Sequence, residues 1–595
     1  MCGIIACRTH RPAAEYLLTA LRRLEYRGYD SVGVAVRTTA GDIARLRTIG
    51  RIGALELQLR QWTGAELDGT GIGHTRWATH GPVTEDNAHP HNDCSGRISL
   101  VHNGTIENAD RLRSALAGAG HRFTSAVDSE VLTHLIEDEL LVADDLPSAV
   151  RNALAVAEGT WALAVLERGT GRIVVAANGS PLLVARTAHG VFAASDIAAI
   201  ADWVDEFQVV EDGDVMELTP TDPVACTDQN RVQPTMVRCI WRSGDADLNG
   251  YADHMAKEID EQPEAAMRVL DELAGGVADG TLWGDLGLAP FDRLQVIACG
   301  TSLNAGMVIG NAVHGLAGLP VTRCVASEAG MDLPEPRTLC LAISQSGETA
   351  DVLHAVSTRV AEGCSILAVT NSSHSTLARR ADGVVHCAAG PEIGVAATKT
   401  FVCQIIAGVA VTISALVAMS RVSRIQAIGL VDELRRLPDQ LARAGTVAKS
   451  VVPPLAEECI DASGYVFIAR GTGLPYAAEG ALKLKELTYR WAEHYPAGEL
   501  KHGPLALISD GTPVVVVDNG DPKLATNIAE VQARGGRVVR IGPPGSCVPV
   551  VEDPMGPWGP LQSALPLQIL ARTSALLLGR DVDKPRNLAK SVTVE

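Results

Sequence analysis

The sequence predicts an α+β domain with antiparallel sheets, followed by two α/β domains with parallel sheets. Over about the first 220 residues, short apolar runs such as VGVAV, GIGHTRWA, RISLVHNG and WALAVLE accompany the helical pattern AAEYLLTALRRLEYRG. From about residue 294, apolar runs lead directly into Gly/Ser-rich turns and helices, as in LQVIACGTS and LCLAISQSGETADVLHAV. That second pattern is typical of strand–turn–helix units in a parallel sheet.

The C-terminal half contains an internal repeat. VIACGTS near 299 has an echo in VFIARGTG near 470, and ISQSGET at 343–349 has a weaker echo in VVVDNGD near 517. This spacing predicts two related α/β domains. The expected organisation is a first domain over 2–220, a linker over 221–285, α/β domains over 286–425 and 455–585 separated by a helical linker over 426–454, and a tail over 586–595.

Composition limits the class of protein. A net charge of −19 argues against nucleic acid or an anionic membrane as the main partner. The 13 cysteines include no CxxC pair, so no zinc or disulfide framework is expected and a reducing cytoplasm fits best. The apolar stretch 405–419 is shorter than the roughly 20 residues of a spanning helix and predicts a buried core helix.

The chain opens MCGIIACR. If Met1 is removed, Cys2 carries both a thiol and an α-amino group whose usual pKa is about 7.7–8.0, so the amine can accept the thiol proton. The alternative is that Cys2 only begins an apolar strand.

Three further segments of the first domain carry polar groups suited to amide hydrolysis. Arg76 could bind a carboxylate, and Asp128 could bind an ammonium group. Asn103 and Gly104 offer a side-chain amide and an unshielded N–H for an oxyanion hole. With a cysteine nucleophile, these groups describe an amino-acid amide hydrolase. The arginine could instead form a surface ion pair, and Asn-Gly could be a hairpin turn; the histidines of NAHPH are expected to be structural.

The second half offers a phosphate site and a proton-transfer site. SQSGET places hydroxyls and N–H groups at a helix start, which suits a phosphate monoester or, alternatively, a simple N-cap. In EGALKLKE, Glu479, Lys483 and Glu486 share one helical face, which could also be a solvated salt-bridged face. Glycines on both sides of Lys501-His502 predict turns that expose the histidine. Such groups beside a phosphosugar suit proton transfer between adjacent carbons.

Taken together, these motifs resemble one family from Cys2 to Glu595. MCGI, RRLEYRGYDSVG, HTRWATHG, NAHPH, VHNG, SQSGETAD, EIGVAATKTF, EGALKLKE, AGELKHGPLALI and DKPRNLAKSVTVE occur in this order. The chain is identified from them as similar to the glutamine–fructose-6-phosphate aminotransferases (isomerizing). The resemblance implies an Ntn-hydrolase-like glutaminase domain and two sugar-isomerase (SIS) domains.

The resemblance also implies roles for particular residues. Cys2 matches the nucleophile, Asn103 and Gly104 the oxyanion hole, and Trp77 the gate of an ammonia channel. The glutamine contacts match Arg76, Thr79, His80 and Asp128. The phosphosugar contacts match Ser302, Ser344, Gln345, Ser346, Thr349 and the backbone of Val395. Glu486 matches the base that moves a proton between C1 and C2 of the sugar, and Lys483 lies beside it. Lys590 matches the lysine that forms a Schiff base with the ketose. His502 matches a ring-opening residue that the neighbouring subunit of a homodimer supplies.

The implied reaction converts D-fructose 6-phosphate and L-glutamine to D-glucosamine 6-phosphate and L-glutamate, the first step of hexosamine biosynthesis, without metal or organic cofactor. Departures occur at ASEAGMD (326–332), at Asp253-His254 before Met255, and at AEHYPAGE (492–499). They keep open a specialised paralog that aminates a related ketose phosphate. Two more hypotheses are a phosphoribosyl amidotransferase and a sugar-phosphate-sensing regulator, and SQSGET and the retained catalytic residues argue against them.

Overall fold

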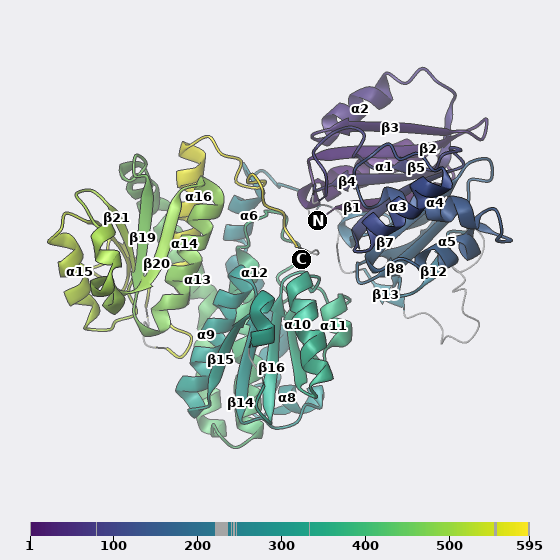
Figure 1. Cartoon of the computed structure of the whole chain (residues 1–595). Coiled ribbons are helices and arrows are strands. Elements are labelled where there is room, and N and C mark those ends of the chain that lie inside the picture. The colour runs from purple at the N-terminus through teal and green to yellow at the C-terminus, as the bar shows by residue number, and fades with distance from the viewer. Residues whose placement is uncertain are drawn as a thin grey trace. The chain divides into compact units, whose positions relative to one another are not determined.

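The computed structural model describes residues 2–78, 80–219, 236–239, 241, 244, 247–331, 334–552 and 556–592. The chain forms two compact units, Met1–Asp247 with Ser591–Glu595, and Leu248–Lys590 (Figure 1). Thr79 and most of the predicted exit from the first domain, TPTDPVACTDQNRVQP, lie outside the described residues. The domain boundaries proposed from the sequence remain a prediction.

The N-terminal unit contains two antiparallel sheets, as the sequence predicted. One has the strand order β13-β11-β9-β10-β1-β4-β2-β3, and the other has the order β12-β8-β7-β6-β5. The strands are β1 Gly3–Thr9, β2 Ser31–Thr38, β3 Ile43–Ile49, β4 Leu67–Arg76, β5 His91–Asn92, β6 Ile98–Ile106, β7 Gly159–Glu167, β8 Ile173–Asn178, β9 Leu183–Thr187, β10 Gly190–Ala194, β11 Glu206–Val209, β12 Val215–Glu217 and β13 Met236–Arg238.

Helices cover the outer faces of both sheets, so the unit has four layers. In β1, Ile5 and Cys7 pack toward the helix α1, whereas Ile4 and Ala6 belong to the core between the sheets. Because successive side chains of a strand point to opposite faces, burial on both sides explains the near-continuous apolar runs. The helices are α1 Ala13–Leu24, α2 Ile52–Arg60, α3 Ala109–Ala119, α4 Glu130–Glu139 and α5 Leu146–Leu154, with 3₁₀ turns η1 Glu25–Arg27 and η2 Ile197–Ala199.

The C-terminal unit contains two parallel five-stranded sheets with the same topology. Their orders are β15-β14-β16-β17-β18 and β20-β19-β21-β22-β23, so the predicted repeat is confirmed as a repeat of fold. The strands are β14 Arg293–Ala298, β15 Val321–Val325, β16 Thr338–Ser344, β17 Ser365–Thr370, β18 Gly383–His386, β19 Gly464–Ala469, β20 Trp491–Pro496, β21 Pro513–Val517, β22 Arg537–Gly542 and β23 Val548–Pro549.

Helices surround and connect the two parallel sheets (Figure 1). They are α6 His254–Asp260, α7 Gln262–Leu273, α8 Thr281–Leu286, α9 Gly300–Ala317, α10 Ala350–Ala361, α11 Thr376–Arg380, α12 Lys399–Ala418, α13 Arg424–Glu458, α14 Leu474–Thr488, α15 Leu524–Gln532 and α16 Ala564–Leu577. The 3₁₀ turns are η3 Ala274–Gly276, η4 Ala326–Met331, η5 Gly471–Gly473, η6 Ala497–His502, η7 Pro504–Leu507 and η8 Leu561–Ser563. Helix α12 is apolar enough to cross a membrane, but 89% of its most apolar window is buried in the protein. It is the core helix predicted from the stretch 405–419.

The departure at Asp253 has a structural explanation. Its carboxylate accepts a hydrogen bond from the N–H of Ala256 at 2.8 Å and so caps the N-terminus of α6. The same carboxylate pairs with Arg572 of α16, whose Nε lies 2.8 Å from Oδ1. Asp253 therefore fastens the first helix of this unit to one of its last.

Candidate active sites

The Cys2 side chain lies at the end of β1, against the end of β4. Its sulfur accepts a hydrogen bond from the N–H of Trp77 at 3.2 Å, and its carbonyl accepts one from Nδ2 of Asn103 at 3.0 Å. Burial raises the pKa of the thiol, while the Trp77 N–H and the Arg76 guanidinium favour the thiolate. The thiol is therefore neutral at rest and needs a base before it can attack a carbonyl.

A buried histidine, His74 of β4, orients the Asn103 amide. His74 Nε2 lies 3.0 Å from Asn103 Oδ1 and 3.1 Å from the carbonyl oxygen of His102. Both neighbours are acceptors, so this nitrogen must carry the proton. Burial lowers the pKa of His74 to about 3, so the ring stays neutral. With Oδ1 held in this way, the Asn103 NH₂ group is directed at the Cys2 backbone.

The Arg76 guanidinium is buried and stabilises the turn that follows β4. Its Nη2 donates to the carbonyl oxygen of His80, and Nη1 lies 3.4 Å from the carbonyl of Pro82. Asp30 supports the same turn, because its carboxylate accepts the N–H of Ala78 at 2.8 Å. Arg76 and the His80 backbone are thus brought together, whereas the His80 side chain is exposed.

Gly104 lies near the end of β6, and Asp128 contacts the last residue of that strand. Gly104 has a φ of +132°, and a Cβ there would stand 2.1 Å from the carbonyl oxygen of Thr160. Asp128 precedes α4, and its Oδ2 accepts the N–H of Ile106 at 2.8 Å. Position 104 therefore has room only for glycine, and the end of β6 is hydrogen-bonded to Asp128.

Gly104→Ala is expected to destabilise the N-terminal unit and, if Gly104 belongs to an oxyanion hole as the sequence resemblance implies, to abolish glutamine hydrolysis. The backbone conformation alone costs a non-glycine residue about 1–3 kcal/mol, and the contact with Thr160 adds to this. Chemical denaturation and a glutamate-release assay measure both effects. The matched control is Gly118→Ala in α3, where a Cβ meets nothing within 4 Å; equal behaviour of the two variants would contradict this account.

In the C-terminal unit, two hydroxyl-rich turns lie side by side. Strands β14 and β16 are neighbours, with Ala298 paired to Ile343, so the turns after them share one edge of the sheet. In the sheet order 2-1-3-4-5, this pair is the switch point at which α/β proteins bind ligands. The first turn carries Ser302, whose Oγ accepts from Gln404 Nε2 at 3.0 Å.

The second turn contains the SQSGET residues. Ser344 Oγ lies 2.9 Å from Thr349 Oγ1 and accepts the N–H of Gly347 at 3.1 Å. Ser346 Oγ accepts the N–H of Glu348, and the carbonyl of Gln345 accepts the N–H of Asn371. Thr349 is the N-cap of α10. The turn thus gathers hydroxyls at a helix N-terminus, as an anion site requires.

Glu486 of α14 is held by a buried lysine. Lys483 Nζ lies 2.6 Å from Glu486 Oε2 and 3.6 Å from Glu479 Oε1, so the predicted shared face is confirmed. Glu479 in turn accepts from Thr301 Oγ1 at 3.0 Å and from Asn304 Nδ2 at 2.8 Å. The carboxylate cluster is therefore joined to the residue beside Ser302.

Lys590 reaches a loop formed by residues 392–395. Its Nζ lies 2.5 Å from Glu392 Oε2 and 2.7 Å from the carbonyl oxygen of Gly394. The N–H of Val395 donates to the carbonyl of Asp583 at 3.0 Å, so this loop holds the C-terminal segment at two points. The Glu392 carboxyl is buried, but Lys590 and backbone N–H groups lower its pKa to about 2. In this state the Lys590 ammonium is held in an ion pair with Glu392.

The fold of a single chain does not place His502 in the hydrogen-bonded cluster of Glu486, Lys483 and Glu479. This histidine lies at the exposed end of η6, and among the described residues it has no hydrogen bond or ion pair.

A second buried glutamate, Glu258, accepts hydrogen bonds from the 392–395 loop and predicts how the stability of the protein depends on pH. Burial, and then the Glu392 charge, raise the pKa of Glu258 to about 8. The folded state therefore holds a proton that the unfolded state has lost above about pH 4.5, so stability falls as pH rises from about 5 to 8, by up to about 1.4 kcal/mol per pH unit. Glu258→Gln should remove this slope in calorimetry, whereas the exposed Glu264→Gln control should keep it; a wild-type slope in both variants would contradict the assignment.

The fold and the two sites define a glutamine amidotransferase joined to sugar-isomerase domains. The glutamine amidotransferase domain model matches residues 74–202, and the SIS domain model matches residues 287–414 and 460–542. The chain belongs to the glutamine–fructose-6-phosphate aminotransferase (isomerizing) family.

Full-length relatives and a solved structure support this membership. The family members of Thermus thermophilus and Pseudomonas putida are 43% and 41% identical to this chain, with complete coverage of both sequences in each case. The C-terminal domain of glucosamine-fructose-6-phosphate aminotransferase from Francisella tularensis is 33% identical with a TM-score of 0.53, covering 57% of this chain and all of that one.

Sequence reasoning missed His74 behind Asn103 and Glu392 as the partner of Lys590. It placed Glu479 on one helical face with Lys483 and Glu486, but it missed the contact of Glu479 with Thr301. Each of the three missed positions lies inside a quoted motif, HTRWATHG, EGALKLKE or EIGVAATKTF. Membership in these motifs could have marked the three residues as important. It could not identify their partners, because those lie 29 to 198 positions away in the sequence.

Proposed function

We propose that this chain converts D-fructose 6-phosphate and L-glutamine into D-glucosamine 6-phosphate and L-glutamate, the first step of hexosamine biosynthesis. The observation that carries the proposal is the presence of two complementary sites in one family member. Cys2 lies against an amide donor and a backbone N–H. Glu486 is held by Lys483 in a fold with hydroxyl-rich turns at a sheet switch point.

In the glutaminase half, the Cys2 sulfur attacks the amide carbon of glutamine, and its proton passes to the α-amino group exposed by loss of Met1. Asn103 and Gly104 donate to the oxyanion, which requires the Asn103 NH₂ group to turn from the Cys2 carbonyl to the substrate oxygen. Ammonia leaves, and water then cleaves the thioester to glutamate. Arg76, Thr79 and His80 bind the substrate carboxylate, Asp128 binds its ammonium group, and Trp77 gates the ammonia path.

In the isomerase half, the sugar phosphate binds the two hydroxyl-rich turns. The residues assigned to it are Ser302, Ser344, Gln345, Ser346, Thr349 and the backbone of Val395. Lys590 forms an imine with C2 of the ketose, expelling water, and ammonia then replaces the lysine. Glu486 removes a proton from C1 and returns one to C2, which yields the aldose carrying an amine at C2. Lys483 keeps this carboxylate in place.

We further propose a homodimer in which His502 of one subunit opens the sugar ring bound by the other. The exposed position of His502, which has no hydrogen bond or ion pair to the described residues of its own chain, supports this arrangement. We also expect the enzyme to work in the cytoplasm. A crosslinking or sedimentation measurement, combined with mixed dimers of His502→Ala and Glu486→Gln chains, tests subunit sharing. Random pairing of the two inactive variants makes about half of the dimers mixed, and one of the two sites in each mixed dimer is complete. About a quarter of the wild-type activity is therefore expected, and no recovery in verified mixed dimers would contradict the proposal.

A product assay tests the function itself. Purified protein is given L-glutamine with fructose 6-phosphate, and both glucosamine 6-phosphate and glutamate are measured. Equal amounts of the two products are expected. Glutamate without amino sugar would contradict the proposed acceptor, and a panel of other ketose phosphates would then identify a specialised paralog.

A further inference from the structure

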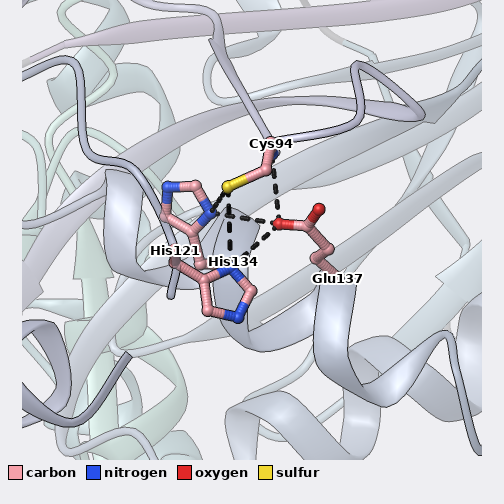
Figure 2. A group of neighbouring side chains, drawn as sticks. All are labelled: Cys94, His121, His134 and Glu137. Atoms are coloured by element: carbon pink, nitrogen blue, oxygen red, sulfur yellow. Dashed lines mark hydrogen bonds and ion pairs between the residues drawn. The ribbon is translucent and has the colours of Figure 1, made fainter. Parts of the chain in front are cut away.

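Four side chains that the proposed reaction does not use converge on the outer part of the N-terminal unit. They are Cys94 from the turn between β5 and β6, His121 directly after α3, and His134 and Glu137 on one face of α4 (Figure 2). One potential ligand atom from each lies within 4.8 Å of every other. These atoms are a thiol sulfur, two imidazole Nδ1 atoms and a carboxylate oxygen.

Four of the six distances between these atoms have the size expected around a tetrahedral metal ion, and the other two are no longer than 4.8 Å. Cys94 Sγ lies 3.7 Å from His121 Nδ1 and 3.5 Å from His134 Nδ1. Glu137 Oε2 lies 3.0 Å from the first nitrogen and 3.2 Å from the second. Tetrahedral zinc, with its usual bond lengths to S, N and O, gives S···N edges of about 3.6 Å and N···O edges of about 3.3 Å. The observed edges differ from these by no more than about 0.3 Å, so an ion fits with minor adjustment.

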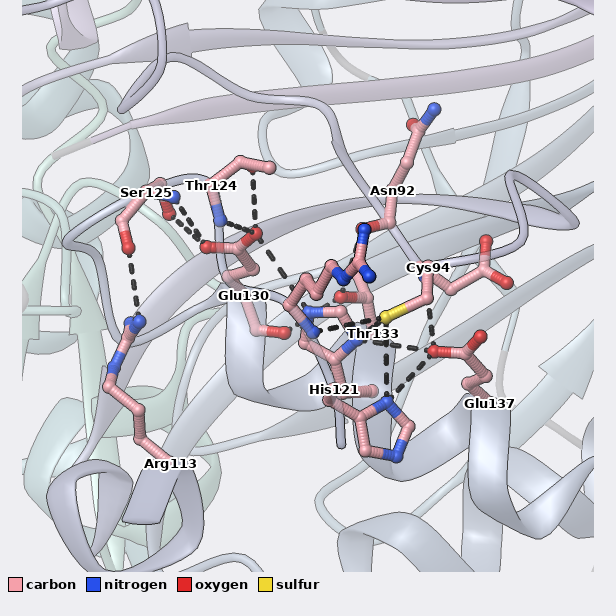
Figure 3. Close-up of polar contacts among 12 residues, drawn as sticks. Asn92, Cys94, Arg113, His121, Thr124, Ser125, Glu130, Thr133 and Glu137 are labelled. Carbon is pink, nitrogen blue, oxygen red and sulfur yellow. Dashed lines mark hydrogen bonds and ion pairs between the residues drawn. The ribbon is translucent and has the colours of Figure 1, made fainter. Parts of the chain in front are cut away.

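The surrounding groups are arranged as they are around metal ligands (Figure 3). His121 directs Nδ1 inward and Nε2 toward Asp138 Oδ1, 2.9 Å away. On His134, the outer Nε2 has a carboxylate nearby but beyond hydrogen-bond distance, because Glu130 Oε1 lies 3.9 Å away. The Cys94 sulfur accepts the N–H of Arg122 at 3.3 Å, and the Cys94 N–H donates to Glu137 Oε2. Carboxylates behind ligating histidines and N–H groups at the thiolate are the usual second layer of a metal site.

Glu130 fixes the segment that carries His121. Its two carboxylate oxygens accept four hydrogen bonds, from the N–H and the hydroxyl of both Thr124 and Ser125, at 2.7–2.8 Å. The same glutamate faces His134. The geometry of the cluster is therefore set by groups outside it, as expected for a preorganised site.

A metal-free hydrogen-bonded cluster is the alternative, and it places the protons of these groups differently. His121 has a carboxylate oxygen at each ring nitrogen, so without a metal both nitrogens must carry protons. His134 also faces Glu137 through Nδ1, and the two ring centroids are only 5.0 Å apart. With a metal bound, each Nδ1 offers its lone pair to the ion, and Nε2 of His121 keeps its hydrogen for Asp138 Oδ1.

We propose that Cys94, His121, His134 and Glu137 form a tetrahedral site for a divalent transition-metal ion, with zinc as the occupant. A thiolate, two imidazoles and one carboxylate are ligands that zinc accepts, and four protein ligands leave no open position. When the ion binds, the Cys94 thiol and the His121 Nδ1 each release a proton to solvent. The site is therefore structural, and it joins the β5–β6 turn to the α3–α4 segment that leads to Asp128. The spacing of the four residues resembles no zinc motif, so the sequence had predicted no metal here.

Metal analysis of untagged full-length protein tests the proposal. After growth with zinc and dialysis against metal-free buffer, about one zinc per chain is expected. Cys94→Ser and His121→Ala should lose it, whereas Cys547→Ser and His10→Ala, which remove an exposed thiol and an exposed imidazole elsewhere, should retain it. No zinc in the wild type, or equal zinc in Cys94→Ser, would overturn the proposal.

Two further measurements do not depend on the ligand variants folding well. Cobalt added to the wild-type apoprotein should give a thiolate-to-cobalt charge-transfer band and the intense visible bands of a tetrahedral ion; their absence would overturn the proposal. Asp138→Asn changes only the outer layer and should weaken zinc binding about 10–100-fold in chelator competition. Unchanged zinc affinity in Asp138→Asn would contradict the assigned geometry.

Discussion

Replacing Cys2 with alanine is expected to reduce glutamine hydrolysis on the order of 10⁶-fold, as loss of a covalent nucleophile does in other hydrolases. The Cys2 sulfur is the proposed nucleophile; it accepts the Trp77 N–H, and the Cys2 carbonyl accepts from the Asn103 amide. Release of glutamate from L-glutamine measures the effect. Intact-protein mass spectrometry of the wild type should also show the loss of Met1, because the α-amino group of Cys2 is the proposed base.

The control is Cys239→Ala, which removes another half-buried thiol from the same unit. It should keep the wild-type rate. Cys2→Ala should also retain proton exchange at C1 of fructose 6-phosphate, because that chemistry belongs to the other unit. Glutamine hydrolysis that survives in Cys2→Ala would show that the nucleophile has been assigned to the wrong residue.

Glu486→Gln is expected to have the second large effect, a loss of about 10²–10⁴-fold in proton transfer between C1 and C2. Glutamine preserves the size of the side chain and a hydrogen bond to Lys483, but it cannot accept the C1 proton. Deuterium incorporation at C1 of fructose 6-phosphate in D₂O, followed by NMR, isolates this step from glutamine chemistry. Glutamate release from L-glutamine should be retained.

Glu493→Gln is the matched control for this variant. Glu493 lies in β20 and is partly exposed; it pairs at 3.3 Å with Lys485 of α14, which is on a different face of that helix from Lys483. It should exchange the C1 proton at the wild-type rate. If Glu486→Gln also did so, while Glu479→Gln did not, the base would be the buried Glu479 and the present assignment would be wrong.

The fold could be predicted largely from local sequence patterns. The runs before SQSGET and CGTS identified parallel strands, because a strand buried on both faces is continuously apolar and its turn follows directly. The α12 helix was likewise predicted from its composition, and the structure buries it. The expected linker over 221–285 contains helices that its description as a linker did not specify, among them α6 and α7, with Pro263 in the first turn of α7. Proline is tolerated there because that N–H has no partner within the helix.

The candidate sites could be predicted only where their residues share a short motif. Lys483 and Glu486 are one helical turn apart, so their contact follows from the helix period. Lys590 and Glu392 are 198 positions apart, and only the folded chain brings them together. Cys94 could not be predicted as a metal ligand for the same reason. The other three proposed ligands come from two other segments and follow no known spacing.

The central claim is that one chain takes nitrogen from glutamine and places it on a sugar phosphate. The most direct test supplies glutamine labelled with ¹⁵N in the side-chain amide, fructose 6-phosphate and an excess of unlabelled ammonium, and then measures the isotope in the amino sugar by mass spectrometry. We predict glucosamine 6-phosphate that carries the ¹⁵N label in nearly every molecule. Unlabelled amino sugar, or labelled ammonia without amino sugar, would contradict the claim that the two sites work as one enzyme.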